Sequence, residues 1–134
     1  MSMFGALDVA GSGMRATRKW LDAVSDNIAN INTASRTDQE AFRSRMIVAQ
    51  AENYGGAGGI RVVGAAFGNA EGRLVYSPTH ALADNEGMVR MPDIDLGDQM
   101  TQLMIAQRGY QANISVIERA KDAYQMALQL GRRT

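Results

Sequence analysis

Apolar side chains recur through the first part of this chain at spacings that alternate between four and three residues. Thr17 is the one polar member of this pattern, termed here the N-terminal stripe: Met3, Leu7, Ala10, Met14, Thr17, Leu21, Val24, Ile28 and Ile31. A heptad spacing places all its members on one side of an α-helix and leaves the charged residues between them facing water. The segment predicts a surface helix of roughly 28 residues, about 40 Å long at ~1.5 Å per residue.

A second stripe with the same spacing lies near the other end of the chain. This C-terminal stripe consists of Leu96, Met100, Leu103, Gln107, Tyr110, Ile114, Ile117, Lys121, Tyr124 and Leu128. Pro92 stops the preceding segment, and either Asp93 or Asp95 can cap the new helix. Asp98 follows Asp95 by three residues, which is the spacing of a capping box. The pattern predicts a second long helix within residues 93–134.

The middle of the chain has a different character, because glycines interrupt short apolar pieces throughout residues 34–92. Three of these pieces, at 60–63, 73–76 and 88–91, are predicted strands of about four residues each. They suffice for a small hairpin but are too short for a sheet with a core of its own. The mostly polar residues 34–45 are expected to form an exposed, mobile loop.

The three segments predict a mainly α fold in one structural unit: an N-terminal helix (1–33), a Gly-rich β-hairpin and loop region (34–92) and a C-terminal helix (93–134). The helices are expected to pack as an antiparallel, coiled-coil-like hairpin, since each must bury an apolar stripe. Ala106, Ala120 and Ala127 widen the second stripe, so a thin two-helix rod leaves apolar surface uncovered. That surface predicts partner chains, without which the helices are expected to be loose.

Composition excludes several classes of function. The 14 basic residues balance 14 acidic ones, so there is no overall field to hold nucleic acid or an anionic membrane. The absence of cysteine excludes disulfides and thiolate metal sites. Residues 1–8 lack the basic and apolar regions of a cleaved signal peptide, and no apolar run approaches the ~20 residues of a membrane span. Taken alone, these signals favour the cytoplasm.

One cluster in the middle segment contains the residue types of a hydrolase triad. Ser77, His80 and Asp84 lie close together in the sequence. They lack the strand–turn–helix elbow of such enzymes, and triad members normally come from distant segments. A proline-containing turn at 77–80 is the better interpretation.

Two further patterns suggest ligand sites but have simpler explanations. No Lys-Ser or Lys-Thr pair follows the glycine cluster at 55–59, so a linker or hairpin turn is favoured over a phosphate loop. Asp93, Asp95 and Asp98 lack the spacing of a calcium-binding loop, and helix capping already accounts for them. We therefore predict no catalytic residue, no metal, no cofactor and no small-molecule substrate.

Four residues of the second helix favour a binding face: Gln107, Gly109, Tyr110 and Asn113. Glycine inside a helix costs up to ~1 kcal/mol relative to alanine, so Gly109 indicates the close approach of another backbone. Gln107 lies in the stripe, where a polar residue can select register and partner. The other interpretation is a core tyrosine with polar neighbours.

Two motifs resemble those of a known family. Residues 25–33, Ser-Asp-Asn-Ile-Ala-Asn-Ile-Asn-Thr, contain the Asn-Ile-Ala-Asn-x-Asn-Thr signature found near the N-terminus of flagellar rod, hook and hook-associated proteins. Residues 95–103 and 106–113 are similar to the C-terminal signature of that family. Segments 76–80 and 85–92, with the short length, look like its proximal-rod members. In most relatives the Asn-Thr pair is followed by a glycine and an aromatic-basic pair. Here Thr33 is followed by Ala34-Ser35, and the aromatic-basic pair comes later, at Phe42-Arg43. The longer loop that results also looks like the proximal-rod type.

The resemblance implies a structural rod subunit that polymerises through its terminal helices and transmits torque from motor to hook. It implies other copies of the chain, other rod proteins and the flagellar export apparatus as partners. It also implies type III export, without a cleaved signal peptide, into the rod that spans the periplasm, with the terminal helices forming an inner tube. The other hypothesis is a cytoplasmic helical-hairpin adaptor or secretion chaperone that binds one partner through the same stripes.

The predicted assembly interface combines residues of both stripes and both motifs. It comprises Leu21, Val24, Asn27, Ile28, Asn30, Ile31, Thr33, Met100, Leu103, Gln107, Gly109, Tyr110, Asn113, Ile114, Ile117 and Tyr124.

Overall fold

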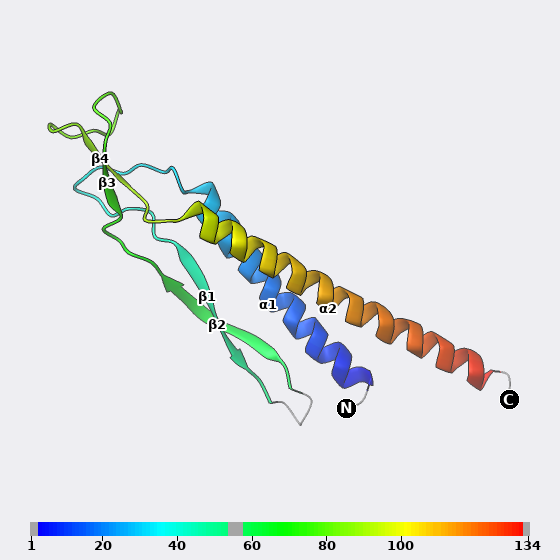
Figure 1. The fold of residues 1–134 in the computed structure, drawn as a ribbon. Helices are drawn as coiled ribbons and strands as arrows, with labels where there is room; N and C mark the ends of the chain where they lie inside the picture. The colour runs from blue at the N-terminus through cyan, green and yellow to red at the C-terminus, as the bar shows by residue number, and fades with distance from the viewer. Residues whose placement is uncertain (1–2, 54–57, 133–134) are drawn as a thin grey trace.

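The computed structural model describes residues 3–53 and 58–132, in which two long helices are joined through two β-hairpins (Figure 1). In chain order the elements are α1 (Met3–Ala29), β1 (Arg45–Ala51), β2 (Ile60–Phe67), β3 (Arg73–Tyr76), β4 (Met88–Met91) and α2 (Leu96–Gly131). The helices lie side by side in opposite directions, and β1 and β2 lie along α1 (Figure 1). The prediction of terminal helices with a small β region between them is confirmed.

α1 is the middle layer of the molecule, with α2 on one side and the β1–β2 hairpin on the other. The N-terminal stripe is confirmed, because all nine of its members are buried or partly buried. A second buried edge of α1, which includes Ser12 and Ala16, lies outside the stripe. The Ser12 hydroxyl accepts a hydrogen bond from the Ile60 amide at 3.1 Å, and so ties the start of β2 to α1.

The two helices meet in a definite antiparallel register. Thr17 lies opposite Gly109, where a Cβ built on the glycine would stand 3.2 Å from Thr17 Cγ2. Gly13 lies opposite Asn113, and a Cβ built on Gly13 would stand only 2.7 Å from the asparagine Oδ1. Moving four residues along α1 therefore corresponds to moving four residues back along α2. Glycine and short side chains let the helix backbones approach closely along this contact.

The C-terminal stripe coincides only in part with the face of α2 that lies against α1, and its partly buried members are Leu103, Tyr110, Ile114 and Ile117. The buried residues of α2 are Gln99, which lies outside the stripe, and Ala106, which is one of the alanines that widen it. The stripe residues Leu96 and Met100 are 50% and 45% exposed, and Tyr124 and Leu128 are also exposed. These exposed side chains are the part of the stripe that the contact with α1 leaves uncovered.

α2 begins where the sequence predicts. The Asp95 carboxylate accepts a hydrogen bond from the Asp98 amide at 2.7 Å and satisfies one of the free amides of the first turn. Asp98 does not complete a capping box, because its own carboxylate accepts a bond from Gln102 Nε2 at 2.9 Å. An acidic residue in the first turn also suits the helix dipole.

The β region is more extensive than predicted. β3 and β4 have the predicted bounds and pair antiparallel. β2 continues to Phe67, and its partner β1, which was not predicted, pairs with it through a bulge between Val48 and Ala49. Of the glycine cluster at 55–59, Gly58 and Gly59 belong to the described residues, and 55–57 lie outside them.

The segment between α1 and β1 is tied down at several points, so the prediction of an exposed, mobile loop is wrong in part. Ser35 exchanges backbone hydrogen bonds with Arg90 at 2.8 and 2.9 Å. The Ala41 amide donates to the Ala70 carbonyl at 2.8 Å, and Ala41 is only 4% exposed. Charged residues such as Asp38 and Glu40 are exposed as expected.

Candidate functional site

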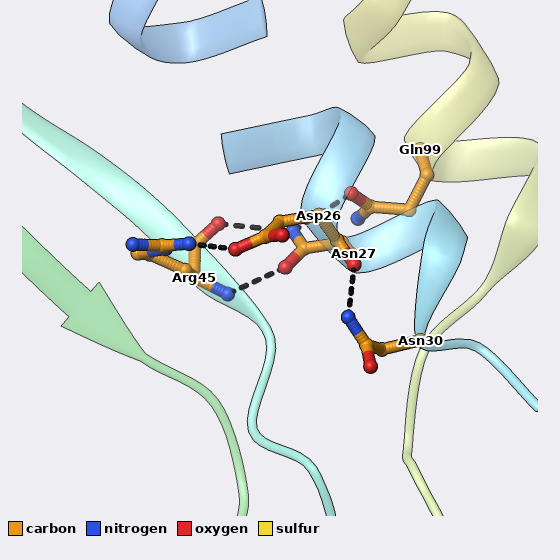
Figure 2. Close-up of polar contacts among 5 residues, drawn as sticks. All are labelled: Asp26, Asn27, Asn30, Arg45 and Gln99. Atoms are coloured by element: carbon orange, nitrogen blue, oxygen red, sulfur yellow. Dashed lines mark hydrogen bonds and ion pairs between the residues drawn. The ribbon is translucent and has the colours of Figure 1, made fainter. Parts of the chain in front are cut away.

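Asn27, in the last turns of α1, forms a junction between three elements (Figure 2). Its side-chain Nδ2 donates to the Arg45 carbonyl at 2.9 Å and to Gln99 Oε1 at 3.0 Å. Its Oδ1 accepts the Arg45 amide at 2.8 Å. Asn27 is 1% exposed and Gln99 is 6% exposed, so these bonds form away from water. One amide side chain thereby joins α1, the start of β1 and the start of α2.

The neighbouring motif residues hold the end of α1. Asp26 forms an ion pair with Arg45, which adds a second link between α1 and β1 (Figure 2). Asn30 Nδ2 donates to the Asp26 carbonyl at 2.9 Å, so it satisfies a carbonyl of the last helical turn. The Thr33 hydroxyl donates to Asn30 Oδ1 at 3.2 Å. The N-terminal motif therefore acts within the subunit as the connection between helix and hairpin.

The structure divides the residues predicted for the assembly interface by exposure. Val24 and Asn27 are buried within the chain. The exposed members are Thr33, Met100, Gln107 and Tyr124. The remaining members are partly buried: Leu21, Ile28, Asn30, Ile31, Leu103, Gly109, Tyr110, Asn113, Ile114 and Ile117.

Gly109 has a close neighbour within its own chain. The prediction placed another backbone against it, whereas the structure places the Thr17 side chain of α1 there. Asn113 lies one turn further along and donates from Nδ2 to the Gly109 carbonyl at 2.8 Å. Gly109 and Asn113 thus belong to the α1–α2 contact, while Gln107 points to solvent.

Large apolar side chains are exposed along α2 and the β1–β2 hairpin. On α2 they are Leu96, Met100, Met104, Ile105, Val116, Tyr124, Met126, Leu128 and Leu130. On the hairpin they are Met46, Val48, Ile60, Val63 and Phe67. Exposed apolar surface on this scale marks an interaction site. The prediction missed the hairpin residues, because their alternation was visible only once β1 had been identified, and it missed Met104 and Ile105 beside the C-terminal stripe.

The end of α2 projects beyond the described start of α1 (Figure 1). The antiparallel register places α2 residues beyond roughly Ala123 past Met3. Residues 121–130, termed here the C-terminal overhang, are all exposed although they include four large apolar side chains: Tyr124, Met126, Leu128 and Leu130.

The residues of the possible triad serve local turns. The His80 amide donates to the Ser77 carbonyl at 3.0 Å, which confirms the predicted turn. His80 Nδ1 accepts the Leu82 amide at 3.1 Å. Asp84 Oδ1 accepts the amides of Glu86 and Met88, both at 2.9 Å. The Met88 hydrogen bond is the main reason that the pKa of Asp84 lies below its usual value, although desolvation acts in the opposite direction.

Within residues 3–53 and 58–132, no group of three or more His, Cys, Asp or Glu side chains is placed to hold a metal ion. Neither of the two described helices is long and apolar enough to cross a membrane.

Both ends of the chain match models of flagellar families. The model described as "Flagella basal body rod protein" matches residues 7–34, and the one described as "Flagellar basal body rod FlgEFG protein C-terminal" matches residues 85–130. The first match contains the whole N-terminal motif, including Asn27. The second contains the start of α2 with Gln99.

Full-length relatives carry the similarity through the middle region. The flagellar basal-body rod protein FlgC of Salmonella typhimurium is 35% identical over 133 residues, which cover 98% of this chain and 99% of the relative. The FlgC protein of Borreliella burgdorferi is 30% identical and covers 97% and 98% of the two chains. The FlgC protein of Bacillus subtilis is also 30% identical, with 98% and 100% covered. The chain therefore belongs to the FlgC family of flagellar basal-body rod proteins.

Proposed function

We propose that this chain is a non-enzymatic structural subunit of the bacterial flagellar basal-body rod. The observation that carries the proposal is the outward direction of its large apolar side chains, in a chain related over its whole length to rod proteins. Its own core is built mainly from alanine and valine, with Val24 and Val89 as its largest fully buried aliphatic side chains. A subunit of this kind gains most of its packing when neighbouring subunits cover its surface.

The Asn27 junction fits a subunit that transmits torque. Torque passes through a rod only if the elements of each subunit keep their relative positions under load. Asn27 fixes α1, β1 and α2 to one another through one buried and two partly buried hydrogen bonds, and the ion pair between Asp26 and Arg45 reinforces the link. We infer that force applied to either helix reaches the hairpin through this point.

The finer parts of the proposal concern partners and location. The partners are other copies of this chain and other rod proteins, and delivery is by the flagellar export apparatus without a cleaved signal peptide. The outward part of the C-terminal stripe, with Met100 and Gln107, is proposed to form coiled-coil packing with helices of neighbouring subunits. The location is then the part of the rod that crosses the periplasm.

Purified basal bodies test this proposal against the adaptor or chaperone hypothesis. Quantitative mass spectrometry of detergent-extracted, salt-washed basal bodies is expected to find the chain at a constant ratio to other rod proteins. A chain found only in the cytosol, in a stoichiometric complex with one partner, would support the adaptor or chaperone instead.

A further inference from the structure

An apolar groove of about 530 Å³ lies between the β1–β2 hairpin and α2, with α1 as its floor. Its lining includes Gly13, Ala16, Trp20, Met46, Ile60 and Asn113. The described residues that line it include no ionisable side chain. Its polar groups can be satisfied locally, as where Trp20 Nε1 donates to Gln102 Oε1 at 3.4 Å. The groove is therefore suited to a segment that is apolar and uncharged.

All but the first two residues of the C-terminal overhang, Lys121 and Asp122, form a segment with these properties. Its residues 123–130 include no charged side chain. Its large apolar residues occur at every second position from Tyr124 to Leu130, so along a helix they alternate between nearly opposite sides. Tyr124 and Leu128 lie on one side and Met126 and Leu130 on the other, with Gln125 and Gln129 between them, so a single flat apolar surface cannot cover all four large side chains. The overhang therefore requires a groove.

The overhang cannot reach the groove of its own molecule. α2 is one unbroken helix from Leu96 to Gly131, and Gln102 and Asn113 of this helix already line the groove. Residues 121–130 continue the helix away from the groove. The partner that receives the overhang must therefore be a different molecule, and a second copy presents a groove of matching character.

The two surfaces also agree in length. The groove follows α2 from Gln102 to Asn113, and both this stretch and the overhang span roughly 15 Å at ~1.5 Å per residue. Burying residues 123–130 there removes no charged side chain from water, so the contact avoids the main cost of desolvation. Gln125 and Gln129 supply polar groups able to pair with Gln102 and Asn113.

We propose that the C-terminal overhang of one copy docks in the apolar groove of a second copy. The two surfaces are different parts of the chain, so the contact is head-to-tail. A head-to-tail contact that does not close into a ring repeats into an open helical filament. The inference rests on the proposed rod function, for which it supplies a specific contact between subunits.

The absence of cysteine allows a direct test. A tagged Leu128→Cys chain is mixed with an untagged Met46→Cys chain under mild oxidation, and a disulfide-linked heterodimer is expected. The control replaces Met46→Cys by Val63→Cys. Val63 lies on the same hairpin but does not line the groove, and its 46% exposure matches the 49% of Met46, so the two cysteines are equally accessible. Leu130→Cys with Ile60→Cys repeats the test at a second point. The proposal is overturned if the Val63→Cys control links as efficiently as Met46→Cys, or if neither groove pair forms a disulfide.

Introducing one charge on each side of the contact tests it in cells. Leu128→Glu and Met46→Lys are each expected to reduce motility, because each places one charge in an apolar contact. The double variant is expected to regain swimming, since the two charges meet between copies. If the double variant swims no better than the worse single variant, docking is contradicted. The rod function still stands in that case if the wild-type chain is found in basal bodies. If the disulfide forms but the chain is absent from basal bodies, the contact stands and the rod function is rejected.

Discussion

At the scale of single residues, the N-terminal motif acts inside the subunit. Asn27 was predicted at an interface between chains, and within the chain its side-chain hydrogen bonds join α1 to Arg45 and Gln99. Asn30 satisfies the end of the helix. Asn27 and Asn30 of the motif thus each have a structural reason for their identity. Asn27 presents both a donor and an acceptor, which neither aspartate nor leucine of similar size provides.

Replacing Asn27 tests the junction. Asn27→Ala leaves the buried partner groups of Arg45 and Gln99 without hydrogen bonds and is expected to lower the free energy of unfolding by about 2–3 kcal/mol. Urea denaturation followed by circular dichroism measures the change. The control is Asn32→Ala in the same motif, which is exposed and should change stability by less than about 0.5 kcal/mol. Similar effects of the two substitutions would show that Asn27 does not hold the junction.

Gly109 and Thr17 form a second testable pair. Alanine at 109 should improve helix propensity by about 0.5–1 kcal/mol, but its methyl group would stand 3.2 Å from Thr17 Cγ2. We expect Gly109→Ala to be neutral or destabilising in the wild-type chain. Thr17→Ser removes the threonine methyl group, Cγ2, and keeps the hydroxyl. In that background Gly109→Ala should therefore stabilise the chain. Equal effects of Gly109→Ala in both backgrounds, measured as a double-mutant cycle, would place Gly109 outside the contact.

At the scale of elements, local signals predicted the helices well and tertiary contacts decided the rest. The heptad spacing and the Asp95 cap are read from neighbouring residues, and both are confirmed. β1 has no such signal, because its partner is the distant β2 and its exposed side chains give only a weak alternation. The face of α2 that meets α1 also depends on Gly13, a residue of the other helix that lies close to Asn113, so the C-terminal stripe alone identified that face only in part.

The loop between β3 and β4 should respond to pH through Asp84. Because its folded-state pKa is lowered, the stabilisation from this carboxylate is present above the ordinary value of 3.8 and is lost as the pH falls through the lowered pKa. Amide exchange at Met88 is expected to accelerate on that acid side. Asp84→Asn, which keeps the acceptor oxygen without the charge, should remove this pH dependence. An unchanged pH profile in Asp84→Asn would exclude Asp84 as its source.

α2 should not be uniformly stable in the free subunit. Residues 99–113 pack against α1, whereas the C-terminal overhang is exposed along its whole length. Helices held by little tertiary contact open readily, so amide hydrogen exchange in a dilute monomer is expected to be fast at 121–130 and slow at 99–113. Strong protection of the overhang in a verified monomer would show that it needs no partner.

At the scale of the whole molecule, the chain is a thin stack of α2, α1 and a hairpin, with its larger apolar side chains outside. Length, neutral charge and motif order led to a rod subunit, and the full-length similarity to FlgC proteins agrees. The contacts between subunits were only partly predictable. They depend on which residues the α1–α2 contact leaves exposed, and the stripes alone do not determine that choice.

The outward apolar face of α2 is expected to become buried when the subunit enters the rod. Methionine oxidation by hydroxyl radicals, read by mass spectrometry, reports this directly, because Met100, Met104 and Met126 are 45%, 52% and 64% exposed in the free chain. All three are expected to oxidise readily in the isolated monomer and to be protected in purified basal bodies. Equal oxidation of these three residues in monomer and basal body would show that this face of α2 stays exposed in the rod.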